Sequence, residues 1–467
     1  MKNLTVKDIL KVTNGELIVG KEDFECKNFS KDTRIIEKGD TYIGLKGENF
    51  DGNLFWKEAL LKGAECVIIQ EIQITEEEKK EFANKIIIKV QDTLEALYKI
   101  ASLKRSFYNI PVIAITGSVG KTSTKDMVSN VVSQKYNTLK TQGNNNNNIG
   151  LPFTILKLQD HEAMVLEMGM NHLGEISLLT KIAKPDICII TNVGTSHIGN
   201  LGSRENILKA KLEILEGNEN ATIIINNDND MLHKWYEENK KMKTIKTYGI
   251  QEESDIKVKN IHLEEESSEF LYLDKNEEIK VRVPVAGEHF VLNSMCAILV
   301  GQCLEIDRLK IKKGIEEFEL TKKRMDIDNL PGDIKIINDT YNASFESMQS
   351  SLKNLTNYNN RKIAILGDMF ELGDYAKELH EKVGAEVAKN KIDILITSGE
   401  NAEHIAKSAK KEGMKEENVY YFKQKENILE LLEKIKKSGD VILWKASNGM
   451  RFFDLVEEFK KKLIKGE

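Results

Sequence analysis

The chain has 467 residues, more than one hydrophobic core usually contains, so roughly two to four domains are expected. Hydrophobic residues make up 40% and charged residues 30% of it, a balance typical of globular proteins. The formal net charge is −6 and basic residues are mixed with acidic ones, so the basic face that nucleic-acid binding needs is missing. No apolar stretch approaches the roughly 18–20 residues of a membrane helix, which argues against membrane insertion.

The N-terminus and the cysteines indicate the compartment. Residues 1–8 lack the long apolar segment of a signal peptide. The cysteines form no CxxC pair, which argues against a disulfide framework or a zinc ribbon. They are Cys26, Cys66, Cys188, Cys296 and Cys303. We therefore expect a cytoplasmic protein.

Residues 1–107 mix short strands with short helices and predict a small α/β domain. The region ends in a predicted helix at residues 93–107, whose apolar side chains share one face. Those side chains are Leu94, Leu97, Ile100 and Leu103. Pro111 then opens a different pattern, so the first domain is predicted to end before it.

Residues 108–322 predict a central domain with a mostly parallel sheet. Short apolar runs of the kind found in buried parallel strands recur at residues 112–115, 163–166, 187–190 and 222–225. Helical patterns alternate with these runs, and the first helix has apolar residues at helical spacing. They are Met127, Val128, Val131 and Val132. Residues 251–283 are charged and alternating, and predict an antiparallel excursion.

Residues 323–467 repeat the alternation of strands and helices and predict a Rossmann-like, doubly wound C-terminal domain. Its predicted strands are 334–337, 362–366, 392–396 and 441–444. The region has no GxGxxG motif, so it need not bind a dinucleotide.

A phosphate-binding loop is predicted at residues 116–122, Thr-Gly-Ser-Val-Gly-Lys-Thr. A strand, a loop with two glycines, and Lys and Thr opening a helix form the geometry that binds a triphosphate. Backbone N–H groups face the anion, Lys121 adds a charge, and the Thr122 hydroxyl can bind Mg²⁺. Ile115 stands where the usual Walker pattern has glycine, and the alternative is a strand-to-helix turn with an exposed lysine.

Two further polar residues follow predicted strands. Glu167 stands at the carboxyl end of its strand, where α/β proteins bind ligands, and can bind the same Mg²⁺ as Thr122. The alternative is a salt-bridged acid at a strand end. His197 follows the next strand, but a lone histidine in a loop is more often a cap or a surface residue. The pattern leaves its role open.

Lys211 falls on the apolar stripe of a predicted helix that Ser203 caps. It lies four residues from both Ile207 and Leu215, whereas Lys209 points elsewhere. Burial lowers the pKa of an ammonium group, and the resulting amine can react with CO₂ to form a carbamate that binds metal like a carboxylate. A lysine that extends to the surface is the alternative, and the pattern alone favours it.

Several polar clusters allow two interpretations. The asparagine run at residues 144–148 is either compositional drift or a polar substrate loop. His289 precedes a predicted helix that Asn293 enters, and this asparagine either pairs with adenine or caps the helix. Clusters at residues 339–343, 367–373 and 445–448 end strands of the third region. They suggest that the third domain closes over the second-domain site.

Together these motifs resemble the Mur ligases, ATP-dependent enzymes of peptidoglycan precursor synthesis, over nearly the whole chain. Residues 32–34 and 45–52 are similar to the family's N-terminal, nucleotide-sugar-binding domain. Residues 116–122 resemble its TGxxGKT loop, and residues 143–152 resemble its GNxNNxIGxP segment. Residues 167–176 resemble the strand-end motif of the family branch that adds D-Ala-D-Ala, and the most discriminating segments for that branch are residues 339–343 and 367–373.

The resemblance implies residues for each ligand of an ATP- and Mg²⁺-dependent site. Those for ATP are Gly117, Ser118, Val119, Gly120, Lys121, Thr122 and Ser123, with Asn293, Arg324 and Asp339. Two Mg²⁺ ions are implied, one bound by Thr122 and Glu167 and the second placed by His197 and an N6-carboxylated Lys211. The implied catalytic residues are Lys121, Glu167, His197 and Lys211. Those for substrate are Asp32, Arg34, Thr141, Asn144, Asn147, Tyr341 and Asn342.

The implied reaction has two steps. The carboxylate of a UDP-N-acetylmuramoyl-tripeptide attacks the γ-phosphate of ATP, and the amine of D-Ala-D-Ala then attacks the acyl phosphate to give an amide, ADP and phosphate. Catalysis of this kind depends on positioning and on cations that stabilise phosphoryl charge. We expect a monomer whose three domains, residues 1–107, 108–322 and 323–467, close on binding.

One departure and three alternatives remain. Relatives often have Lys-Gly-Ser-Arg where this chain has Lys-Ala-Ser-Asn at residues 445–448, so Arg451 is a candidate substitute for the missing arginine. Another ligase of the superfamily, such as a folylpolyglutamate synthase, is the alternative within the class. A nucleotide-dependent regulatory protein would need the loop but not Lys211. An inactive relative is disfavoured because the predicted catalytic residues are all retained.

Overall fold

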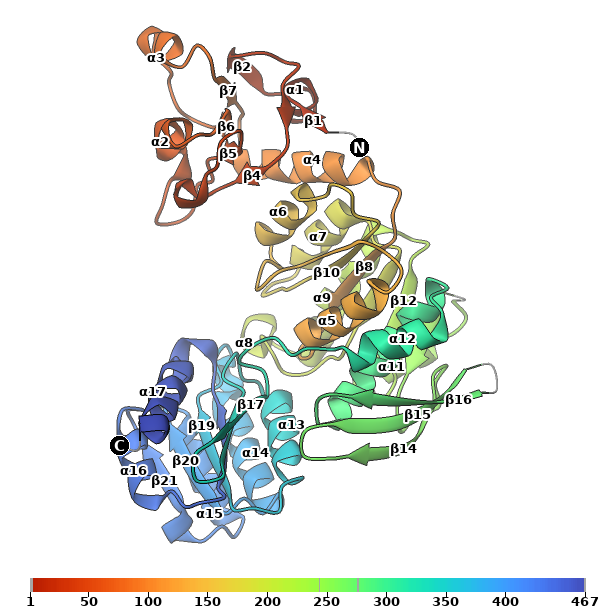
Figure 1. The fold of residues 1–467 in the computed structure, drawn as a ribbon, viewed down its shortest axis with the longest axis vertical. Helices are drawn as coiled ribbons and strands as arrows, with labels where there is room; N and C mark the ends of the chain where they lie inside the picture. The colour runs from red at the N-terminus through yellow and green to blue at the C-terminus, as the bar shows by residue number, and fades with distance from the viewer. Residues whose placement is uncertain (1–2, 243, 275–276, 466–467) are drawn as a thin grey trace.

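The computed structural model describes residues 3–242, 244–274 and 277–465. Residues 1–2, 243, 275–276 and 466–467 lie outside these ranges, and residues 275–276 belong to the predicted antiparallel excursion. Figure 1 shows three α/β bodies that follow one another along the long axis of the molecule. No helix of the described ranges is long and apolar enough to cross a bilayer.

The N-terminal body is built on a five-stranded sheet of order β2-β7-β6-β5-β4, in which only the β2–β7 pair is antiparallel. Its strands are β1 (Leu4–Thr5), β2 (Glu16–Val19), β3 (Glu25–Cys26), β4 (Phe29–Ser30), β5 (Thr41–Ile43), β6 (Cys66–Ile69) and β7 (Ile86–Lys89). Its helices are α1 (Val6–Thr13), α2 (Trp56–Leu61), α3 (Glu76–Glu81) and α4 (Thr93–Ser106). The helix predicted at residues 93–107 is confirmed, and α4 packs against two helices of the central body, α6 (Gly150–Leu156) and α7 (Glu175–Ala183).

The central body contains a fully parallel sheet of order β13-β12-β11-β8-β10-β9. Its strands are β8 (Val112–Thr116), β9 (Thr138–Lys140), β10 (Ala163–Glu167), β11 (Ile187–Ile190), β12 (Thr222–Asn226) and β13 (Ile245–Tyr248). Its helices are α5 (Lys121–Val132), α6 (Gly150–Leu156), α7 (Glu175–Ala183), α8 (Ile198–Leu201), α9 (Arg204–Leu212), α10 (Asp230–Asn239), α11 (Glu288–Cys303) and α12 (Arg308–Glu316). All four predicted strands are present.

Alternation along β8 explains why helices cover both faces of the central sheet. Val112 and Ala114 pack in one apolar core with residues of α6 and α7, while Ile113 and Ile115 pack in a second core with α5 and α11. The predicted antiparallel excursion is confirmed as the sheet β14 (Val258–Leu263), β15 (Ser268–Asp274) and β16 (Glu277–Val283), which shares the second core.

The C-terminal body has a six-stranded sheet of order β17-β18-β22-β19-β20-β21, parallel except for the edge pair β17–β18. Its strands are β17 (Asp326–Leu330), β18 (Ile334–Asn338), β19 (Lys362–Gly367), β20 (Ile394–Ser398), β21 (Val419–Phe422) and β22 (Val441–Lys445). Its helices are α13 (Phe345–Leu355), α14 (Ala376–Lys389), α15 (Ala402–Lys411), α16 (Asn427–Ile435) and α17 (Phe452–Lys465). Helices α13 to α15 pack on one face and α16 and α17 on the other, which confirms the doubly wound class.

Candidate active site

A cleft of about 530 Å³ lies where the carboxyl edge of the central sheet faces the C-terminal body. Its central wall comes from the segments that follow β8, β10 and β11, and from the start of α11. Its C-terminal wall comes from residues 339–351 and Lys445. Ligand sites of open parallel sheets form at this edge, because strands end there and helices begin.

The phosphate loop is held in one shape by its neighbours. Gly117 has φ +155°, and a Cβ there would lie 1.8 Å from the hydroxyl oxygen of Thr191, so only glycine fits. The backbone N–H groups of Ser118 and Val119 donate to Oδ1 of Asn192 at 3.1 and 2.9 Å. Gly120 then turns in the left-handed region and α5 begins. The loop therefore presents the start of a helix to the cleft, as predicted.

Lys121 and Thr122 are the first two residues of α5, and both line the cleft with Ser123. Nζ of Lys121 donates to the carbonyl of Gly117 at 2.7 Å. Burial lowers the pKa of this lysine, although the nearby Glu167 carboxylate opposes that shift. The Thr122 hydroxyl accepts a hydrogen bond from Nη2 of Arg324 at 3.0 Å. An arginine of the C-terminal chain segment thus already touches the phosphate loop.

Glu167 ends β10 and is only 2% exposed. Oε1 accepts a hydrogen bond from Nδ2 of Asn146 at 2.8 Å, while Oε2 is buried with no hydrogen-bond partner among the described residues. The backbone N–H of Glu167 donates to the buried Thr141 hydroxyl at 3.0 Å. Thr141 therefore anchors the strand end and does not line the cleft.

The asparagines of the run at residues 144–148 have different roles. Asn144, Asn146 and Asn147 line the cleft. Oδ1 of Asn147 accepts from the backbone N–H of Gly150 at 2.8 Å, so this side chain caps the start of α6. Asn146, which the sequence did not single out, is the one that binds Glu167. All five residues are asparagine, so no pattern distinguishes the inward one.

His197 lines the cleft in the left-handed region, with φ 64°. Its Nδ1 lies 2.6 Å from Oε2 of Glu371 in the C-terminal body, an ion-pair contact without the alignment of a hydrogen bond. The contact with His197 lowers the pKa of Glu371. Glu371 was predicted only as part of a strand-end cluster. Asp368 of the same cluster instead accepts backbone N–H groups of Glu400 and Ala402 within its own body.

Lys211 is buried on α9, as its place on the apolar stripe allowed. It is 1% exposed, whereas Lys209 is exposed on the same helix. Burial lowers its pKa well below the usual value, the charge of Lys121 lowers it further, and Glu346 opposes both. Within the described ranges its Nζ has no hydrogen-bond or ion-pair partner, and it is not among the residues that line the cleft.

Asn293 does not cap a helix. Helix α11 begins at Glu288, so Asn293 lies in its second turn, because the apolar pattern of the helix extends further back than the sequence suggested. Oδ1 accepts the hydroxyl of Thr124 at 3.0 Å, and Nδ2 is buried without a hydrogen-bond partner in the described part of the chain. The free amide N–H₂ belongs to the cleft wall.

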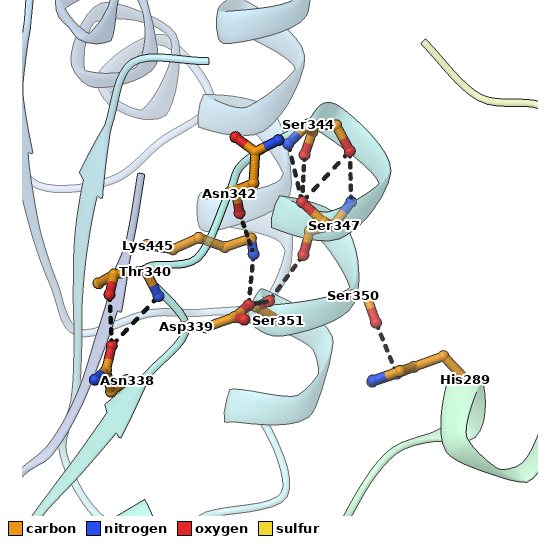
Figure 2. A network of polar contacts seen from close by, with 10 residues as sticks. All are labelled: His289, Asn338, Asp339, Thr340, Asn342, Ser344, Ser347, Ser350, Ser351 and Lys445. Atoms are coloured by element: carbon orange, nitrogen blue, oxygen red, sulfur yellow. Dashed lines mark hydrogen bonds and ion pairs between the residues drawn. The ribbon is translucent and has the colours of Figure 1, made fainter. Parts of the chain in front are cut away.

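The C-terminal wall is a polar network, drawn in Figure 2. Oδ2 of Asp339 lies 2.5 Å from Nζ of Lys445 and accepts the Ser351 hydroxyl at 2.6 Å. Lys445, 2% exposed, also donates to the carbonyl of Asn342 at 3.2 Å. Tyr341 and Asn342 line the cleft, and the Tyr341 ring lies 3.8 Å from the Arg324 guanidinium carbon.

Besides Gly117, Thr141 and Lys211, three more sequence candidates are not among the residues that line the cleft: Asp32, Arg34 and Arg451. Asp32 accepts hydrogen bonds from the exposed Arg34 in the N-terminal body, and those bonds lower the pKa of Asp32 to about 2. Arg451 is exposed and binds Asp454, three residues further on. Neither the pair in the N-terminal body nor Arg451 is among the residues that line the cleft.

A phosphate loop that faces a second α/β body across a cleft defines a nucleotide-dependent enzyme. Three family models match this chain: the Mur ligase family catalytic domain at residues 27–105, the Mur ligase middle domain at 115–301, and the Mur ligase glutamate ligase domain at 323–448. The chain belongs to the Mur ligase family. The family predicted from the motifs is thereby confirmed.

Similarity to individual relatives extends over nearly the whole chain. The chain is 36% identical to the UDP-N-acetylmuramoyl-tripeptide–D-alanyl-D-alanine ligase of Bacillus subtilis, over 97% of this chain and 98% of that protein. A crystal structure of MurF from Acinetobacter baumannii covers 99% of this chain and 100% of its own, with TM-score 0.88 and 29% identity. MurF ligase from Thermotoga maritima in complex with ADP covers 94% and 99%, with TM-score 0.82 and 29% identity.

Proposed function

We propose that this protein joins D-Ala-D-Ala to the carboxylate of a UDP-N-acetylmuramoyl-tripeptide, with conversion of ATP to ADP and phosphate, in peptidoglycan precursor synthesis. It is an ATP-dependent carbon–nitrogen ligase. The observation that carries the proposal is the full-length similarity to relatives of that name, which includes the C-terminal body as well as the phosphate loop. We also propose a cytoplasmic location, which the free cysteines of the described residues support.

ATP is proposed to bind with its phosphates on the loop and its base near α11. Residues 117–123 offer backbone N–H groups, the Lys121 charge and the start of α5. The unpartnered Nδ2 of Asn293 suits an acceptor on a purine ring. Arg324 and Asp339 would approach the nucleotide from the other side of the cleft, where both line the wall.

The residues present fit a first Mg²⁺ ion. The orphaned Oε2 of Glu167 is a buried carboxylate oxygen without a partner in the described ranges, and the Thr122 hydroxyl lies on the same wall. Hard cations take such oxygen ligands, with phosphate oxygens completing the shell. When bound, the ion would neutralise charge between an anionic substrate and the triphosphate.

A second Mg²⁺ ion is proposed to be placed by His197 and an N6-carboxylated Lys211. Burial lowers the pKa of Lys211, which favours the uncharged amine. That amine suits reaction with CO₂, because an uncharged amine is the nucleophile. Among the described residues no three His, Cys, Asp or Glu side chains gather into a metal cluster. A carbamate would add the anionic oxygen ligand that this edge lacks.

The substrate is proposed to extend between the bodies. Residues 1–107 would bind the nucleotide sugar, with Asp32 and Arg34 at its surface, residues 108–322 would bind ATP, and residues 323–467 would close the cleft. The peptide end would meet the polar groups of the walls: Asn144, Asn147, Tyr341 and Asn342, with Thr141 supporting them from behind. There the chain orients the carboxylate toward the γ-phosphate, the acyl phosphate forms, and the dipeptide amine displaces phosphate from it.

A substrate panel tests the proposal. Purified protein is given ATP, Mg²⁺ and each UDP-muramoyl peptide, with D-Ala-D-Ala or single amino acids as the acceptor. We expect phosphate release that requires D-Ala-D-Ala. The product should be heavier than the UDP-muramoyl peptide by the two alanine residues that the amide bond adds. Release with single amino acids alone would assign another member of the superfamily.

A further inference from the structure

The C-terminal body reaches the central sheet with the carboxylate of Glu346, in the first turn of α13. Oε1 accepts the backbone N–H of Thr195 at 2.7 Å, and Oε2 accepts the hydroxyl of the same residue at 3.2 Å. A carboxylate that accepts two hydrogen bonds across an interface is a strong contact. Neither residue was singled out by the sequence, because 151 positions separate them.

Gly194 leaves the space that this carboxylate fills. A Cβ on Gly194 would lie 2.5 Å from the carboxyl carbon of Glu346, and its three nearest atoms would all belong to Glu346. Gly194 is not among the residues with positive φ, so its backbone tolerates a side chain. The glycine is therefore needed for the approach of Glu346 and not for the turn itself.

The segment that Glu346 binds is bonded directly to the phosphate loop. The backbone N–H of Gly194 donates to Oγ of Ser118 at 2.9 Å, and Oγ of Ser196 donates to the carbonyl of Ser118 at 3.3 Å. These two bonds flank the residue that Glu346 holds. A shift of Thr195 would therefore act on the loop through both neighbours.

We propose that Glu346 is a positioning residue that couples docking of the C-terminal body to the shape of the phosphate loop. The inference rests on the proposed function, since it states how the central and C-terminal walls of the proposed active site are aligned with each other. Other contacts share the docking, including Ser350 with His289 (Figure 2) and Lys353 with Glu288. Loss of Glu346 therefore loosens the arrangement without separating the bodies.

A double-mutant cycle on Glu346 and Gly194 tests the coupling. Glu346→Ala removes the carboxylate, and we expect kcat for dipeptide-dependent phosphate release to fall about 10- to 100-fold, the range for a lost charged hydrogen bond. The KM for ATP should change less, because Asn192 still holds the backbone N–H groups of Ser118 and Val119 in the loop. Glu346→Gln keeps an acceptor and should recover part of the rate.

Gly194→Ala should reproduce the loss, because the added methyl group displaces the carboxylate. In the Glu346→Ala background the same methyl group enters vacated space and should cost little more. If the two losses multiply instead, the contact does not carry the effect and the proposal is overturned. Glu403→Ala is the matched control, since this half-exposed glutamate of α15 pairs with Lys407 on its own helix.

An interdomain distance separates this inference from the proposed function. Spin labels on exposed positions of the two bodies, at Lys209 and Lys415 in a chain with Cys303 replaced by serine, report docking without any substrate. A broader or longer distance distribution is expected for Glu346→Ala and Gly194→Ala, and no further change for the double variant. Unchanged distances with unchanged kcat would overturn the proposal, even if the wild-type chain proved to use another acceptor.

Discussion

The two walls of the cleft differ in which polar groups they leave unpaired among the described residues: a carboxylate and an amide on the central wall, and Nε of Arg324 on the C-terminal side. On the central wall, Oε2 of Glu167 and Nδ2 of Asn293 are buried without partners in the described ranges. On the C-terminal wall, Asp339 and Lys445 neutralise each other and Ser351 completes the pair. An unpaired buried polar group costs about 1–3 kcal/mol, so the central wall stores a cost that a ligand relieves. The unpaired groups of the central wall therefore favour ligand binding there, whereas the paired Asp339 and Lys445 favour a fixed shape of the C-terminal wall.

The largest expected effect comes from a change in the central wall. Lys121→Met removes the loop cation while keeping the length and apolar stem of the side chain. Dipeptide-dependent phosphate release should fall roughly 10²- to 10³-fold, the cost of losing one group that stabilises transition-state charge. Steady-state kinetics measure the loss, and unchanged thermal unfolding shows that the fold persists. Lys135→Met, on an exposed lysine beyond the far end of α5, should retain the wild-type rate.

A stability measurement tests the ion pair of the C-terminal wall. Asp339→Asn keeps a polar group of the same shape but leaves the buried Lys445 charge without its carboxylate. Breaking a buried ion pair in this way should cost about 3 kcal/mol of unfolding free energy. Hydrogen exchange of β18 and β22 locates the loss in the C-terminal body. The double change Asp339→Asn with Lys445→Met should recover much of it, and a double variant as unstable as the single one would contradict the pairing.

Lys211 tests whether the central wall depends on a buried group that does not itself line the cleft. Lys211→Ala should lower the rate about 10- to 100-fold, the usual effect of losing a group that orients metal ligands. Formate or acetate should restore part of the activity, because a small carboxylate can replace a carbamate in the vacated space. Lys209→Ala on the exposed face of the same helix is the control. Full activity of Lys211→Ala would remove Lys211 from the site.

Groups fixed by local sequence were predictable. The loop at residues 116–122 and Glu167 each follow a buried strand, so their place at the sheet edge follows from strand order alone. Burial of Lys211 was open from the pattern and is settled by packing of α9. Strands β17 and β21 were missed because they lie at sheet edges, where pairing with a neighbour outweighs apolar character.

Contacts between bodies could not be predicted from spacing. The pairs His197–Glu371 and Thr195–Glu346 join residues more than 150 positions apart, and only the relative placement of two sheets brings them together. Nor could the sequence show that Asn293 lies inside α11, since the helix begins one turn before the polar residues that resemble its start. In this chain local pattern determines the central wall, and tertiary placement determines how the C-terminal wall meets it.

The effect that should be smallest at neutral pH concerns the contact between the walls at His289. Nδ1 of His289 and the hydroxyl oxygen of Ser350 form a hydrogen bond of 2.9 Å. Burial lowers the pKa of His289 to about 4. The carboxylates of Asp339 and Glu288 oppose this shift, and the ammonium groups of Lys445 and Lys353 assist it. His289 is therefore neutral in the folded chain near neutral pH, where the Ser350 contact forms.

The sign of the pH dependence follows from proton binding. Below about pH 6.5 the unfolded chain binds a proton at His289 that the folded chain does not bind until about pH 4. Stability should thus fall by about 1.4 kcal/mol for each pH unit within this window, about 3 kcal/mol across it, and His289→Gln should remove that part of the slope. Thermal unfolding from pH 7.5 to 4.5 measures it, with exposed His262→Gln as the control. Equal slopes for wild type and His289→Gln would show that the junction of the two walls does not sense this proton.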